Sequence, residues 1–185
     1  MVPLYSGSMT RANPLPALSL LSDERNDAVL ERALARLPRS SAFVFRHYHL
    51  DDKARRQRFD ALAAAARAHD HLVILSGTAE LAQEWGADGI YGPPEKLDKL
   101  PGLLRLAAAH DAREILLANR TGADALFLSP VFPTRSHPGG GYLGPVKFRE
   151  LAMQAEMPVI ALGGMTAERA RHLYWPRWAA IDGLS

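Results

Sequence analysis

Short apolar runs alternate along the chain with longer amphipathic stretches. Each run is four to seven residues long and is bounded by turn residues, as is typical of strands buried in a parallel sheet. The runs predict eight strands, at residues 18–21, 42–45, 71–75, 87–91, 103–109, 124–129, 158–162 and 178–181. The stretches between them carry apolar residues at helical spacing and predict helices at residues 26–37, 52–68, 79–85, 111–122, 147–155 and 166–175.

Strands that alternate with helices form parallel units, in which each helix crosses back over the sheet. Eight such strands predict a closed (β/α)8 TIM barrel, because an open doubly wound sheet usually has fewer strands. Such barrels have about 200 residues or more, and this chain has 185, so we expect a compact barrel with shortened helices. Residues 93–102 are the place of that shortening. We expect a disordered lead at residues 1–14 and a single domain at residues 15–185.

Composition narrows the class of protein. Hydrophobic residues make up 48% of the chain and charged residues 23%, which is typical of a globular protein. The absence of cysteine excludes disulfides and thiolate chemistry. No metal site is expected, since His47 and His49 have no carboxylate at metal-binding spacing.

Charge and hydropathy indicate the partners. The net charge is +2, and the basic residues are interleaved with acidic ones, so we expect no nucleic-acid partner. No apolar run is long enough to cross a bilayer, and we expect no membrane partner and a cytoplasmic location. The small positive net charge is compatible with a small anionic substrate. A homo-oligomer is left open.

The loops that follow the strands of a parallel barrel form its active site. Gly163 and Gly164 directly follow the seventh predicted strand and precede a helix that Thr166 can cap. Glycines let backbone N–H groups approach an anion closely, and the start of a helix favours negative charge. We therefore expect a phosphate group at this turn, the alternative being a plain tight turn.

The loop after the sixth predicted strand, residues 130–144, is the strongest local signal of a site. It holds Thr134, Ser136 and His137 together with an arginine and three consecutive glycines, and Ser129 stands at its start. Hydroxyl groups, a guanidinium and flexible backbone suit a phosphate or a pyrophosphate. Long loops in compact domains are usually functional or disordered, and disorder is the alternative here.

Two further polar residues follow predicted strands. Arg46 comes after an apolar strand, so we expect its charge at the barrel mouth, where it would pair with an anion. An ion pair with Asp23 or Asp51 is the alternative. His110 is a candidate acid/base group, and the alternative is a structural histidine.

Residues 122–166 resemble the thiamine phosphate synthase and TenI family of barrels. The family's sixth strand runs into a G/S-P-x-F-x-T loop, which SPVFPT matches, and its seventh strand ends in A-[IL]-G-G-[IM], which ALGGM matches. The order and spacing of the two motifs fit the family. Weaker similarities, such as LLSDER and FVFRHYHLDDKAR, extend over nearly the whole chain.

The resemblance implies a transferase of thiamine biosynthesis that joins hydroxymethylpyrimidine pyrophosphate to a thiazole phosphate. The pyrophosphate leaves with the help of Mg2+, which the substrate would carry, and the thiazole nitrogen attacks the resulting cation. No organic cofactor is implied. By matching position, Arg46 would hold the pyrophosphate and Thr134 and Ser136 would contact phosphate. Gly163 and Gly164 would cradle the thiazole phosphate.

The chain departs from the family at polar positions of the site. The family has Gln and Lys around the arginine of its second strand, Asn-Asp after the third, a second metal-binding Asp after the fourth and Lys in the sixth loop. The residues here are Val44, Tyr48, Ser76-Gly77, Lys96 and His137. One lost electrostatic contact costs on the order of 10²–10³ in rate.

Two alternative functions follow from these departures. A TenI-like tautomerase isomerises a thiazole carboxylate phosphate by proton transfer and needs no pyrophosphate site. Its active members carry a histidine where this chain has Pro130, so His110 or His137 would have to serve as the acid/base. The other alternative is a non-catalytic barrel that binds a phosphorylated ligand or a partner enzyme.

Overall fold

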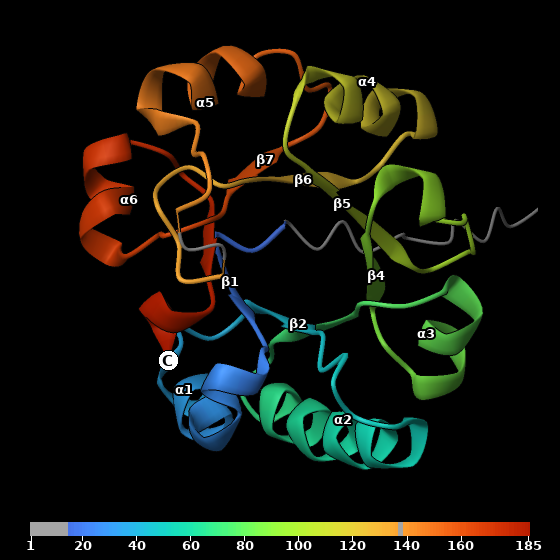
Figure 1. The fold of residues 1–185 in the computed structure, drawn as a ribbon. Helices are drawn as coiled ribbons and strands as arrows, with labels where there is room; N and C mark the ends of the chain where they lie inside the picture. Colours follow the sequence, from blue (N-terminus) through green and yellow to red (C-terminus); the bar gives the residue numbers. More distant parts are fainter. Residues whose placement is uncertain (1–14, 137–138) are drawn as a thin grey trace, which may run out of the picture.

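Eight parallel strands close into a barrel in the order of the sequence (Figure 1). The computed structural model describes residues 15–136 and 139–185, so the predicted lead at residues 1–14 lies outside the described residues. The strands are β1 (Leu18–Leu21), β2 (Ala42–Phe45), β3 (Leu72–Leu75), β4 (Gly89–Gly92), β5 (Leu104–Ala109), β6 (Ala125–Leu128), β7 (Val159–Ala161) and β8 (Trp178–Ala180). Each overlaps its predicted run, and the predicted (β/α)8 fold is confirmed.

Helices form a ring around the barrel (Figure 1). The α-helices are α1 (Leu30–Arg36), α2 (Asp52–Arg67), α3 (Ala79–Trp85), α4 (Ala112–Thr121), α5 (Gly144–Ala152) and α6 (Ala167–Leu173). The 3-10 helices are η1 (Glu24–Val29), η2 (Pro94–Lys96) and η3 (Asp182–Leu184). Within the described ranges only η2 and η3 follow β4 and β8, so the helix between residues 93 and 102 is shortened as predicted. None of the described helices is long and apolar enough to cross a membrane.

Two predicted helices begin earlier than the apolar spacing indicates. The first starts as η1 because Asp23 and Asn26 form a capping box, and it becomes α-helical only at α1. The helix α5 begins at Gly144, three residues before its predicted start. Pro145 explains this start, since its fixed φ suits the first helical turn.

Side chains of the strands fill two apolar layers. Outward-facing residues such as Phe43 and Phe45 pack against the helices in the larger layer. Inward-facing residues such as Val44 and Phe127 fill the interior of the barrel in the smaller one. Because successive residues of a strand point to opposite faces, the polar residue two places after Val44 points inward at the strand end. This alternation brings Arg46 to the mouth of the barrel.

Candidate active site

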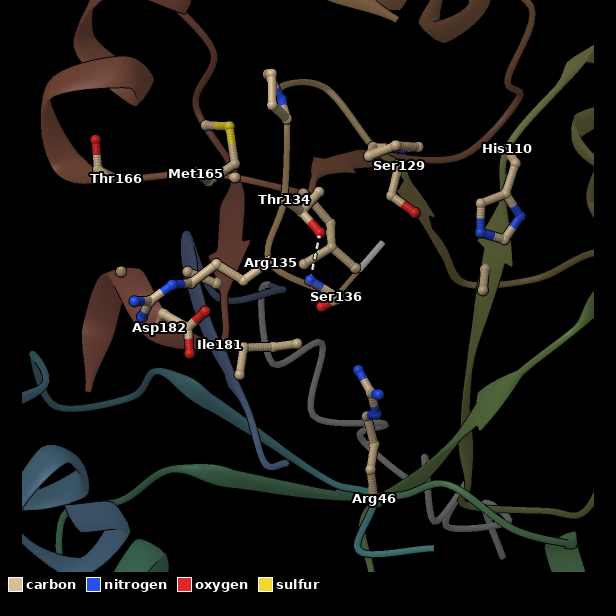
Figure 2. A pocket seen from close by; sticks show the side chains of 18 of the residues that line it. Arg46, His110, Ser129, Thr134, Arg135, Ser136, Met165, Thr166, Ile181 and Asp182 are labelled. Carbon is tan, nitrogen blue, oxygen red and sulfur yellow. Dashed lines mark hydrogen bonds between the residues drawn. The ribbon is translucent and has the colours of Figure 1, made fainter. Parts of the chain in front are cut away.

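A cavity of about 600 Å³ opens at the carboxyl ends of the strands (Figure 2). Seven of the residues predicted for the site line it, namely Arg46, His110, Ser129, Thr134, Ser136, Gly163 and Gly164. The eighth, His137, lies outside the described residues. Arg46 enters from the β2 side, and Thr166 and Met165 lie across the cavity from it (Figure 2).

Gly163 and Gly164 form a turn in which no other residue type fits. Their φ angles are +96° and +62°, in the region that favours glycine. A Cβ atom on Gly163 would lie 2.5 Å from Cα of Pro130, and one on Gly164 would lie 2.4 Å from the carbonyl oxygen of Pro133. The amides of both glycines donate to no described residue. The turn therefore presents two free N–H groups beside the cavity.

The loop after β6 is hydrogen-bonded to the glycine turn. The amide of Val131 donates to the carbonyl of Leu162 at 2.9 Å, and the amide of Phe132 donates to that of Gly163 at 3.0 Å. Within the loop, the Ser136 amide donates to Oγ1 of Thr134 at 2.9 Å. The first two hydrogen bonds join the loop after β6 to the glycine turn, so a shift of one would displace the other.

Arg46 forms the ion pair that was the alternative expectation, and it still lines the cavity. Its Nη2 lies 3.4 Å from Oδ2 of Asp23, a weak contact, whereas Asp51 instead caps α2. Burial raises the pKa of the Asp23 carboxyl, but hydrogen bonds from Arg25 and the charges of Arg25 and Arg46 outweigh it and lower that pKa. The Nε atom of Arg46 is buried without a partner among the described residues. The guanidinium extends into the cavity, where it can meet an anion (Figure 2).

His110 stands on the β5 side of the cavity (Figure 2). Its Nδ1 lies 2.9 Å from Oε2 of Glu114, in the first turn of α4, and its amide donates to the same oxygen at 2.6 Å. The carboxylate orients the ring, and Nε2 has no partner among the described residues, so it can meet a ligand. This geometry suits an acid/base group.

Sequence reasoning missed Arg169, Asp182 and Gly183, which line the cavity. Arg169 donates from Nη1 to the carbonyl of Gly164, and its guanidinium lies 5.0 Å from the centre of the Phe132 ring. Its place one turn after the cap Thr166 was a signal that it faces the mouth. Burial raises the pKa of the Tyr91 phenol to about 12, so this group is a neutral donor at neutral pH. Tyr91 and the arginine of the predicted loop, Arg135, line the cavity as well.

The described acidic side chains do not form a metal site. No group of three histidine or carboxylate side chains converges within the described ranges. The two carboxylates at the mouth, Asp23 and Asp182, both pair with Arg25, at 2.8 and 3.7 Å. These residues do not fit a protein-held Mg2+.

The fold and the cavity define a (β/α)8 barrel protein with its pocket where barrel enzymes bind their substrates. Comparison with protein families is more specific, since the model described as thiamine monophosphate synthase matches residues 18–181. The chain belongs to this family.

Named relatives agree with this assignment. A putative thiamine-phosphate synthase 2 of Aquifex aeolicus is 27% identical over 180 residues, covering 92% of this chain and 97% of that protein. A thiamine-phosphate synthase of Pyrococcus furiosus is 28% identical over 130 residues, covering 67% of this chain and 61% of that protein. These names support the prediction of a transferase-type enzyme of thiamine biosynthesis.

Solved structures confirm the fold. A thiamine phosphate pyrophosphorylase from Pyrococcus furiosus has a TM-score of 0.74 at 24% identity, over 89% of this chain and 84% of that one. FabK from Thermotoga maritima has a TM-score of 0.69 at 14% identity, over 91% of this chain and 58% of that one. At such identities the likeness extends to the fold alone.

Proposed function

We propose that this protein couples hydroxymethylpyrimidine pyrophosphate to a thiazole phosphate and releases pyrophosphate. The observation that carries the proposal is one cavity with two separate places for anions. The glycine turn after β7 lies on one side and Arg46 on the other. Two phosphorylated substrates bound at these places would bring their rings together between them.

The glycine turn is the proposed site of the thiazole phosphate. The free amides of Gly163 and Gly164 are donors that fit phosphate oxygens. The helix α6 that follows has only seven residues, so we assign the anion to these amides and not to a helix dipole. Arg135 and the hydroxyls of Thr134 and Ser136 lie on the same side of the cavity and supply further donors.

Arg46 is the proposed anchor of the pyrophosphate. As the bond between the pyrimidine methylene carbon and oxygen breaks, the electron pair goes to the pyrophosphate. The thiazole nitrogen then forms a bond to the methylene carbon. A guanidinium held beside the leaving oxygens stabilises this growing negative charge. Because the described residues do not fit a protein-held Mg2+, the chain's own share of this stabilisation falls on its arginines and amides.

A second candidate function rests on His110. Its pairing with Glu114 is the arrangement of a proton-transfer group, and a tautomerase acting on a thiazole carboxylate phosphate needs one. This reaction would use the glycine turn and leave Arg46 without a role. The two candidates therefore differ in which residue they need.

Incubation of the protein with both substrates, with Mg2+ or with a chelator, tests the proposal. We expect thiamine phosphate and pyrophosphate in equal amounts, with a larger loss of rate for Arg46→Ala than for His110→Gln. Isomerisation of the thiazole carboxylate phosphate that His110→Gln abolishes would support the second candidate instead. Saturable binding of thiazole phosphate without turnover of any substrate would contradict both and leave a binding protein.

A further inference from the structure

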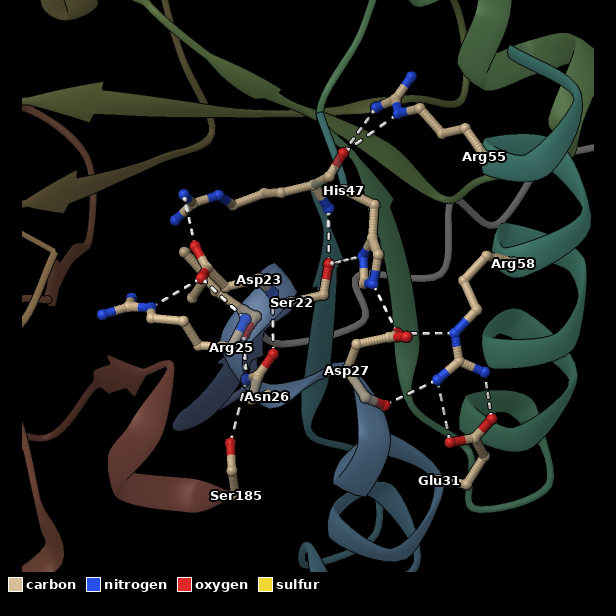
Figure 3. Close-up of polar contacts among 12 residues, drawn as sticks. Ser22, Asp23, Arg25, Asn26, Asp27, Glu31, His47, Arg55, Arg58 and Ser185 are labelled. Carbon is tan, nitrogen blue, oxygen red and sulfur yellow. Dashed lines mark hydrogen bonds and ion pairs between the residues drawn. The ribbon is translucent and has the colours of Figure 1, made fainter. Parts of the chain in front are cut away.

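A network of polar side chains, buried at Ser22 and His47, lies behind Arg46 and connects β1, β2, η1 and α2 (Figure 3). Oγ of Ser22, at the end of β1, lies 2.8 Å from Nδ1 of His47, which follows β2. Nε2 of His47 lies 2.7 Å from Oδ1 of Asp27 in η1. Arg58 of α2 donates to the same carboxylate oxygen at 2.7 Å. The network therefore runs from the barrel wall to the helix layer.

The hydrogen bonds of this network determine which atom of Ser22 and His47 carries each hydrogen. The amide of Arg46 donates to Oγ of Ser22 at 2.8 Å, so the hydroxyl hydrogen is free to go to Nδ1 of His47. The Nε2–H of His47 then donates to Asp27. Burial lowers the pKa of the imidazole, although Asp27 raises it, which agrees with a neutral ring in this tautomer.

These three side chains are not a hydrolytic triad. In such a triad Nε2 of the histidine faces an accessible serine and Nδ1 faces the carboxylate, whereas here the two nitrogens are exchanged. Ser22 is fully buried and already holds the Arg46 amide. The ring of His47 is stacked on Phe45 with 4.8 Å between centroids. No substrate reaches the hydroxyl.

The network instead fixes the backbone of Arg46 by hydrogen bonds. Ser22 fixes the N–H of Arg46, and Arg55 of α2 donates to its carbonyl from two nitrogens, at 3.1 and 3.0 Å. His47 has a φ of +39°, which is unusual for a residue other than glycine and is maintained by its surroundings. These hydrogen bonds therefore determine the direction in which the Arg46 side chain extends from the end of β2.

We propose that His47 is a positioning residue, which orients the Ser22 hydroxyl so that Arg46 presents its guanidinium to a pyrophosphate in the cavity. The inference rests on the proposed function only for the identity of the anion. Since Arg46 is the group that meets the ligand, loss of His47 should affect a pyrophosphate far more than a monophosphate held at the glycine turn.

Calorimetry with inorganic pyrophosphate and inorganic phosphate tests the inference on the full chain. We expect His47→Leu to weaken pyrophosphate about tenfold, a coupling of ordinary size for neighbours in one network, and to leave phosphate affinity within about twofold. The double variant with Arg46→Ala should bind no more weakly than Arg46→Ala alone. His47→Asn should rescue most of the affinity, because asparagine tolerates positive φ and offers Ser22 an acceptor.

Equal weakening of both anions, or additive losses in the double variant, would overturn the inference and assign His47 a structural role only. Nitrogen NMR of the unaltered protein is independent of any variant's folding, and a ring protonated on Nδ1 would also overturn it. Amide exchange separates the two proposals. If Arg46→Ala does not weaken pyrophosphate while His47→Leu speeds exchange of the Arg46 amide, the positioning inference stands and the proposed pyrophosphate site fails.

Discussion

The two sides of the cavity are built by different means. On the β7 side the donors are main-chain amides, and the glycines that expose them have no space for a side chain. On the β2 side the donor is one side chain, Arg46, held by Ser22 and Asp23 just after β1 and by Arg55 of α2. The family motif is retained on the first side, whereas Tyr48 and Ser76 replace family residues on the second.

The difference between the two sides indicates which residues of such a site can change without loss of the other anion-binding groups. A site made of main-chain amides is lost when either glycine is replaced by a residue with a Cβ atom, so neither glycine can change without loss of binding. A side-chain site can change one residue at a time while the backbone stays in place. We therefore expect variants on the β7 side to abolish binding and variants on the β2 side to alter which anion is bound.

The largest effect is expected for Gly164→Asp. The new carboxylate would face the anion, and its Cβ would lie 2.4 Å from the Pro133 carbonyl oxygen, so the loop after β6 must also shift. Phosphate affinity should fall about 100-fold or more. Calorimetry measures this, with Gly141→Asp as the control, because a Cβ there meets nothing within 4 Å. Unchanged affinity in Gly164→Asp would remove the β7 side from the anion site.

The next effect is expected for Arg46→Ala. Loss of a charge-assisted hydrogen bond of about 2 kcal/mol should weaken inorganic pyrophosphate about 30-fold. Inorganic phosphate should be weakened much less. Arg39→Ala is the matched control, since Arg39 pairs with Asp70 on the exposed surface away from the cavity. Equal weakening of the two anions by Arg46→Ala would mean that the two sides do not differ in what they bind.

Stability should depend on pH through the buried histidine of the β2 side. Burial lowers the pKa of both His47 and His71 in the folded protein. The unfolded chain therefore binds more protons as the pH falls below about 6.5, and the free energy of unfolding decreases there. Urea unfolding at pH 7.5 and 5.5 measures the difference. The difference between the two pH values should be smaller in His47→Asn than in the unaltered protein. His172→Asn, at an exposed position, is the control and should leave the difference unchanged. An equal difference in the unaltered protein and both variants would contradict this account.

The smallest effect is expected for Tyr48→Phe. The phenol of Tyr48 is hydrogen-bonded to Ser76, and its ring lies 5.7 Å from the Arg46 guanidinium. Removal of one partly buried hydrogen bond should lower the free energy of unfolding by about 1 kcal/mol and pyrophosphate affinity by a few-fold. Tyr174→Phe, at an exposed position, is the control for both measurements. A loss as large as that of Arg46→Ala would show that Tyr48 itself binds the anion.

Local signals account for most of the fold. Apolar runs of strand length predicted every strand because a parallel strand is buried on both faces and is therefore mostly apolar. The helix starts were less well predicted, as η1 and α5 show, because capping depends on one or two residues such as Asp23 or Pro145. The cellular location stays a prediction.

The sequence by itself determined the barrel, the glycine turn after β7 and the arginine after β2, because each depends on residues adjacent in the chain. The tertiary structure alone decided which groups surround them. Ser22, Asp27 and His47 lie up to 25 positions apart, and only closure of β1 against β2 brings them together behind Arg46. Such contacts leave no periodic pattern, since they depend on side-chain direction and on the packing of elements that are distant in sequence.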